Sequence, residues 1–138
     1  MGGGGIDPMY AVPDADQNGK TVIRFANGVE ESHDWSGELT STILQSSNIP
    51  RRLPVAVSIG YKVTSIGKGA FERCGESLRS VGMQDGLSAI GESAFRGCRN
   101  LELAVVPDSV ATIGDRAFMD CRRLKSVNVP ATASLTGD

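Results

Sequence analysis

Apolar residues recur along this chain with a period of about 23 positions. Segments 63–74, 87–98 and 110–121 carry Ile, Gly, Ala, Phe and Cys at the same five places, offset by 24 and then 23 residues. All three cysteines and three of the four phenylalanines lie on this ladder. Such a period predicts a stack of similar units, because one short unit cannot bury its own apolar face. The ladder residues are Ile66, Gly67, Ala70, Phe71 and Cys74, then Ile90, Gly91, Ala94, Phe95 and Cys98, then Ile113, Gly114, Ala117, Phe118 and Cys121.

A second shared element lies between the ladder segments, at 78–83, 101–106 and 124–129. Apolar residues alternate there after a leucine, and alternation of period 2 is typical of a β-strand. Each unit is therefore expected to hold a strand, a turn, an extended stretch ending in Ile-Gly, and one helical turn. The first unit has the same alternation at Leu53, Val55, Val57 and Ile59.

Stacking of the units makes two predictions about the ladder. The three phenylalanine rings should lie over one another with centroids ~4.5–7 Å apart, the range that favours offset stacking. The repeated glycine should adopt a positive φ at the entry to the helical turn, a conformation that glycine tolerates.

Residues 9–52 do not show the ladder. Residues 20–25 alternate as a strand, Asn27-Gly28 is a good hairpin turn, and 29–35 form the expected return strand.

Residues 36–45 are expected to form a short helix with Leu39, Ile43 and Leu44 on one face. Because repeat stacks need polar terminal caps, we expect the region before the repeats to cap the first unit, with Phe25 and Trp35 as the plug.

The repeat resembles the BspA-like leucine-rich repeats, whose pattern reads approximately L-x-x-I-x-I-P-x-x-V-x-x-I-G-x-x-A-F-x-x-C. The resemblance covers 53–130, with Gln84 in place of a proline and the small Ala104 at a core position. It implies a β-rich α/β solenoid, a leucine-rich-repeat stack of three to four coils with an N-terminal β-hairpin and helix cap. Similar proteins are largely surface or secreted adhesion and interaction modules, and no catalytic residues come with the family.

We expect three parts in the chain: an expression-vector linker at 1–8, a capping region at 9–52, and repeats at 53–138. The last coil begins at 125–130, but the pattern does not continue after it. Leu135 lies one place before the position expected for the next ladder isoleucine. An incomplete coil leaves an unpaired strand edge. Either the chain is a piece of a longer array, or this end associates weakly with a second copy.

Composition narrows the classes of function. The 138 residues carry a net charge of −2 with 40% hydrophobic residues, so nothing predicts a nucleic-acid partner or membrane insertion. The first residues lack the basic start and apolar run of a secretory signal, and they leave the compartment unknown.

Two patterns in the sequence resemble parts of metal sites. Residues 14–19 match the first half of a calcium loop, but its twelfth position is Phe25 where a bidentate Glu belongs. An Asx turn is the preferred interpretation. The three cysteines follow the repeat period and lack short paired spacings, so we expect three unlinked buried thiols and no zinc.

Catalytic and nucleotide-binding patterns are weak as well. Gly67-Lys68-Gly69 lacks the G-K-[ST] of a phosphate loop. His33 and Asp34 are adjacent on an expected strand and should point to opposite faces, so they do not predict a triad. We expect no cofactor and no enzymatic activity.

Alternation along the strands places a row of mostly small, uncharged residues on the outward face of the sheet. This face is expected to bind a protein partner, in an interaction or adhesion module. The alternative is a structural spacer, or a fragment of a larger repeat protein without a binding site of its own. Leu103 and Val105 are apolar at the centre of this face. The competing explanation for Leu103 is a register change that turns it inward in place of the small Ala104. The expected partner-binding residues are Ser80, Leu103, Val105, Ser126 and Asn128.

Overall fold

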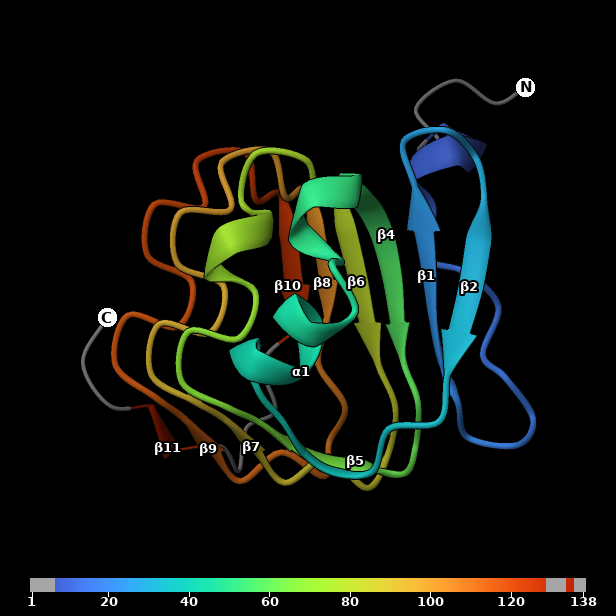
Figure 1. Ribbon diagram of the computed structural model, residues 1–138. Coiled ribbons are helices and arrows are strands. Elements are labelled where there is room, and N and C mark those ends of the chain that lie inside the picture. The colour runs from blue at the N-terminus through green and yellow to red at the C-terminus, as the bar shows by residue number, and fades with distance from the viewer. Residues whose placement is uncertain (1–6, 129–133, 136–138) are drawn as a thin grey trace, which may run out of the picture.

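The computed structural model describes residues 7–128 and 134–135, and for 126–128 and 134–135 it describes the backbone only. Two β-sheets make up most of it (Figure 1). The elements in chain order are η1 (Pro8–Tyr10), β1 (Thr21–Phe25), β2 (Glu30–His33), β3 (Gly37–Leu39), α1 (Ser41–Ser46), η2 (Pro50–Arg52), β4 (Pro54–Ile59), β5 (Val63–Ile66), η3 (Glu72–Cys74), β6 (Ser80–Met83), β7 (Ala89–Ile90), β8 (Leu103–Val105), β9 (Thr112–Ile113), β10 (Ser126–Asn128) and β11 (Ser134–Leu135).

Each repeat contributes one strand to each sheet. The six-stranded sheet has the order β10-β8-β6-β4-β1-β2, and the five-stranded sheet has the order β11-β9-β7-β5-β3. Strands from successive repeats pair in parallel, so that Val57, Val81 and Ala104 lie side by side across β4, β6 and β8. The strand-rich repeat architecture predicted from the alternation is confirmed.

The repeat extends further than the sequence pattern predicts. Leu135 in β11 pairs with Ile113 in β9, in the place that a ladder isoleucine takes in the earlier units. The spacing from Ile113 to Leu135 is 22 residues, one fewer than in the preceding step. Strand register is set by pairing with the neighbouring strand, and a loop that is one residue shorter does not change it. The early position of Leu135 therefore does not end the repeat.

The ladder phenylalanines stack as predicted. Ring centroids are 5.0 Å apart for Phe71 and Phe95 and 5.3 Å apart for Phe95 and Phe118, with interplanar angles of 5° and 4°. Phe71 and Phe95 are fully buried, and Phe118 is partly buried against the same core. This column joins successive repeats through the core between the two sheets.

The prediction of a positive φ at the ladder glycines is wrong. Left-handed residues occur two positions later, at Gly69 (φ 62°), Ser93 (φ 56°) and Arg116 (φ 59°). The ladder position needs glycine because neighbouring repeats approach closely: a Cβ on Gly114 would lie 2.5 Å from the main-chain nitrogen of Glu92. Close backbone approach, and not a special dihedral angle, selects this residue.

The predicted hairpin before the repeats is present. β1 and β2 pair antiparallel, and β1 also pairs antiparallel with β4, so the hairpin extends the six-stranded sheet. Phe25 is buried, and Trp35 packs partly buried against the core.

The predicted helix at 36–45 is only partly correct. Gly37–Leu39 forms β3, which pairs in parallel with β5, and α1 begins at Ser41 after the Thr40 side chain caps it. Pairing with the edge of β5 outweighs the helical pattern here. Leu39 and Leu44 are nevertheless buried, as the helical face predicted, and Ile43 packs partly buried against them.

Leu53 is not the inward start of a strand. Its side chain is 51% exposed and its φ is 59°, because it ends the 3₁₀ turn η2. β4 begins at the next residue, Pro54.

Candidate functional site

The outward face of the six-stranded sheet is the surface that the strand alternation predicted for binding. Directly paired residues share a face of a sheet, so the register defines its members. These are Val22 and Arg24 on β1, Ala56 and Ser58 on β4, Ser80 and Gly82 on β6, Leu103 and Val105 on β8, and Ser126 and Asn128 on β10.

Part of this face is covered by the chain itself. Residues 7–13, which we call the N-terminal strap, cross it, and Ala56, Ser58, Ser80 and Gly82 are all buried. The expectation of an open surface of small side chains is therefore wrong on β4 and β6. Small residues stand there because a segment far away in the sequence packs directly on them.

Ser80, one of the predicted partner-binding residues, is a contact of the strap. Its Oγ donates a hydrogen bond to the carbonyl oxygen of Tyr10. Two positions further along β6, a Cβ on Gly82 would come within 2.6 Å of Cγ1 of Val12. A larger residue at Gly82 would therefore require the Val12 side chain to move.

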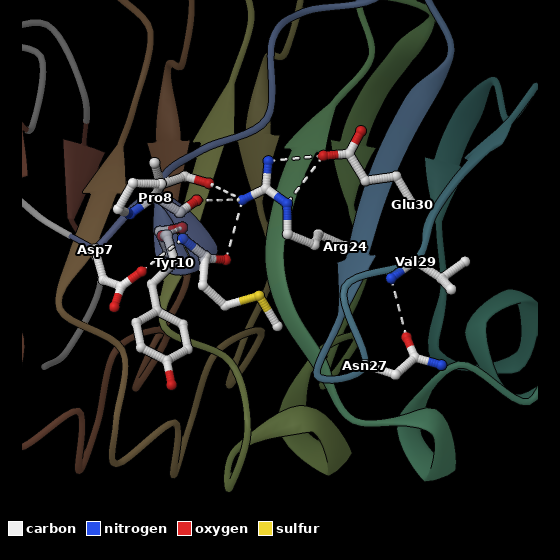
Figure 2. A network of polar contacts seen from close by, with 10 residues as sticks. Asp7, Pro8, Tyr10, Arg24, Asn27, Val29 and Glu30 are labelled. Atoms are coloured by element: carbon white, nitrogen blue, oxygen red, sulfur yellow. Dashed lines mark hydrogen bonds and ion pairs between the residues drawn. The ribbon is translucent and has the colours of Figure 1, made fainter.

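Arg24 holds the strap from the neighbouring strand β1 (Figure 2). Its Nη1 donates to the carbonyl oxygens of Pro8, Met9 and Ala11 at 2.9, 3.0 and 2.9 Å. Its Nε and Nη2 donate to Oε2 of Glu30 at 2.9 and 2.7 Å, a two-pronged ion pair that fixes the guanidinium plane. Nothing in the one-dimensional pattern singled out Arg24 beyond its place on the outward side of a strand.

Two further contacts complete the strap. The guanidinium of Arg79 lies 4.2 Å from the ring centroid of Tyr10, within the range of a cation–π interaction. Oδ1 of Asp7 accepts a hydrogen bond from the main-chain nitrogen of Met9 at 2.9 Å and so caps η1. Asp7 and Pro8, predicted to belong to a linker outside the fold, are part of this contact.

The uncovered part of the face begins at β8. Val105 is 41% exposed, Leu103 is partly exposed, and Ala104 between them is 1% exposed and faces the core. The register of β6 with β8 is regular, so the alternative in which Leu103 replaces Ala104 in the core is wrong. A hollow of about 320 Å³ lies beside Val105, and its lining includes Val12, Pro13 and Met83.

Ser126 and Asn128 are opposite Leu103 and Val105 in β10. The backbone therefore places them on the same face, and their side chains lie outside the described part of the chain.

The calcium-like segment forms the Asx turn that its sequence predicts. Oδ2 of Asp16 accepts hydrogen bonds from the main-chain nitrogens of Asn18 and Lys20 at 2.9 and 3.2 Å. Phe25, which occupies the position of the missing ligand, is buried in β1. Within the described ranges, no group of three or more His, Cys, Asp or Glu side chains could hold a metal ion.

His33 is the last residue of β2 and Asp34 lies beyond the strand, so the predicted strand does not include both residues, and their side chains have different partners. The His33 ring stacks on Trp35 with centroids 4.4 Å apart, and its Nε2 lies 3.3 Å from Oε1 of Glu31. Asp34 instead pairs with Nζ of Lys62 at 3.0 Å. The pKa of Glu31 is lowered, chiefly by its hydrogen bond to Arg52.

The cysteines are free thiols: Cys74 and Cys98 are buried in the core, and Cys121 packs partly buried against it. Burial raises the pKa of Cys74 to about 12 and that of Cys121 to about 11, and it raises the pKa of Cys98 as well. Sγ of Cys121 donates to the carbonyl oxygen of Phe95 at 3.2 Å. Because the thiolate is the reactive form, thiols held protonated in this way are poor nucleophiles.

Helices long and apolar enough to cross a membrane do not occur in the described part of the chain.

Comparison with known proteins places these features in a family. Residues 55–138 match the BspA-type leucine-rich repeat region (6 copies). The crystal structure of a leucine-rich repeat protein from T. pallidum is similar, with a TM-score of 0.53 and 26% identity. That match covers 56% of this chain and 39% of the T. pallidum chain, so this chain spans well under half the length of the protein that it resembles. A comparison with curated proteins finds no match.

Leucine-rich repeats of this type are protein-interaction repeats, and their proteins are typically not enzymes. The match includes more than half of the residues, and the chain belongs to the BspA-type leucine-rich repeat family.

Proposed function

We propose that this chain is a short solenoid of three to four coils that binds another protein, as an interaction or adhesion module without catalytic activity. Residues 9–52 act as its cap and 53–138 as its repeats. The binding surface is the uncovered outward face around β8, with Leu103 and Val105 as its centre and Ser126 and Asn128 beside them.

Exposed apolar side chains on β8 carry this proposal. Val105 is 41% exposed and Leu103 is partly exposed on the same face, next to the largely apolar hollow. Single exposed apolar residues are common on protein surfaces. Two on one short strand beside a hollow form a surface that another protein can desolvate, and each Å² of apolar area buried contributes about 25 cal/mol.

The test compares two lysine substitutions at exposed apolar positions. Val105→Lys changes the proposed surface. Met119→Lys is the matched control, at a 37% exposed residue that follows the ladder residue Phe118. Both variants should keep their stability within about 0.5 kcal/mol, as surface substitutions usually do.

Immobilised wild-type chain and both variants are then used to capture proteins from an extract of the source organism. We expect wild type and Met119→Lys to retain the same proteins and Val105→Lys to lose them. Equal capture by both variants would overturn this face as the binding surface, and no capture by wild type would favour a structural spacer without a binding site of its own.

A further inference from the structure

The strap is held mainly through its main chain. Four consecutive carbonyl oxygens, from Pro8 to Ala11, accept hydrogen bonds from side chains of the sheet: three from Arg24 and one from Ser80. Recognition of a peptide through its main chain is independent of its sequence, and peptide-binding surfaces use it for affinity.

Side-chain contacts add selectivity at three positions of the strap. The Tyr10 ring lies against the guanidinium of Arg79, Val12 sits over Gly82, and Pro13 is buried. Together they select an aromatic residue, an aliphatic residue two positions later, and then a proline.

The charges of the site favour an uncharged peptide. Arg24 is paired with Glu30 at 2.7 Å, and Arg79 has Glu102 at 3.6 Å. Because each arginine already has a carboxylate partner, a peptide gains from its carbonyl oxygens and its aromatic ring more than from acidic side chains.

The site continues past the strap. The hollow of about 320 Å³ is lined by Val12 and Pro13 on one side and by the exposed Val105 on the other. Residues 14–20 connect the strap to β1, and Asp14, Ala15, Gln17 and Asn18 in this segment are exposed. A peptide that lies in the place of the strap and continues into this hollow would contact Val105, whose side chain the strap leaves exposed.

We infer that the outward sheet face from β1 to β8 is a binding site for an uncharged peptide of a partner protein with an aromatic-x-aliphatic-Pro sequence, bound as the strap is, in a 3₁₀ turn followed by extended backbone, and that the strap is its internal occupant. This inference rests on the proposed function, since it names the partner class of the same face. Binding of the partner displaces the strap from Arg24, Ser80 and Gly82.

The test uses full-length chain and a fluorescent peptide with the uncharged sequence of residues 8–13 and blocked ends, and binding is followed by fluorescence anisotropy. A loosened variant, Tyr10→Ser with Val12→Ser, weakens the internal occupant, whose attachment gives it a high effective concentration. We expect the loosened variant to bind the peptide at least tenfold more tightly than wild type. Binding that is no tighter overturns the inference.

Controls act on the site and on the peptide separately. Gly82→Leu, added to the loosened variant, fills the seat of Val12 and should weaken binding at least tenfold. Ala111→Leu adds the same side chain at an exposed position away from the strap and should change nothing. A peptide carrying Val12→Ser should also bind at least tenfold more weakly, a result that does not depend on how any variant folds. Equal binding of the two peptides overturns the assigned selectivity.

Two further outcomes separate the alternatives. A wild-type dimer in sedimentation that disappears on Gly82→Leu would identify a second copy as the occupant and overturn a separate partner. Loss of captured proteins on Val105→Lys without any peptide binding would keep the proposed function and overturn this peptide class.

Discussion

Truncation of the middle ring of the phenylalanine column tests how the repeats hold together. Phe95 is fully buried and stacks on Phe71 at 5.0 Å and on Phe118 at 5.3 Å. Phe95→Ala removes a complete ring from the core and both stacking contacts. The expected cost is ~3–5 kcal/mol, as for other large buried side chains.

A comparison within the column makes the expectation specific. Phe118 is partly buried and, in the described structure, has one stacked neighbour, Phe95. Phe118→Ala should therefore cost about 2 kcal/mol, below the range for a fully buried ring. Phe95→Leu keeps most of the volume and should cost about 1.5 kcal/mol or less.

Urea unfolding provides the assay, followed by Trp35 fluorescence and by circular dichroism. Agreement of the two probes supports a two-state transition, for which the free energies of unfolding can be compared. A cost of 3–5 kcal/mol corresponds to a fall in Tm of about 10–20 °C for a chain of this size. If Phe95→Ala costs no more than Phe118→Ala, the column does not contribute as its geometry implies, and the reasoning fails.

Other predictions follow from single features. Arg116 has a φ of 59°, so Arg116→Gly should stabilise the protein by about 0.5–1 kcal/mol in urea unfolding, and a loss of stability would contradict the strain. Burial raises the pKa of the thiols, so the thiols of the unfolded chain ionise at a lower pH than those of the folded chain. The free energy of unfolding should therefore fall as pH rises above about 9. Cys98→Ala should make this fall less steep, by up to about 1.4 kcal/mol per pH unit. Leu103→Ser should lower Tm by only a few degrees, because the side chain is partly exposed, and a large fall would place Leu103 in the core. Among the described residues β10 is the edge strand of the six-stranded sheet, so we expect weak self-association in sedimentation that Asn128→Pro reduces by removing a main-chain donor. A strictly monomeric profile would rule it out.

Periodic features of the fold were predictable because their cause is repeated in the sequence. The stacking of Phe71, Phe95 and Phe118 follows from one residue type at a fixed offset. The β1–β2 hairpin follows from a local turn signal at Asn27-Gly28. Both depend on interactions between residues whose relation is visible along the chain.

Features set by tertiary pairing were not predictable in the same way. Leu39 belongs to a helical pattern, but the edge of β5 draws Gly37–Leu39 into a strand and delays the helix to Ser41. The left-handed residues Ser93 and Arg116 are not types that tolerate a positive φ, so nothing in their identity indicates the conformation that the turn imposes.

The strap is the largest feature that the strand pattern concealed, and Gly82 was its available signal. Alternation identified Gly82 as outward-facing, which suggested an open surface. Glycine inside a strand weakens it, and it often marks a site where a ligand or another backbone approaches closely. Val12 makes that approach here from 70 positions earlier, and Ser80 meets Tyr10 over the same separation. The separation explains why no local rule connects the two segments. The same glycine shows why the binding face cannot be read as vacant: on β6, smallness of the outward residues reflects an occupant that is already present, whereas on β8 the larger Leu103 and Val105 remain at least partly exposed.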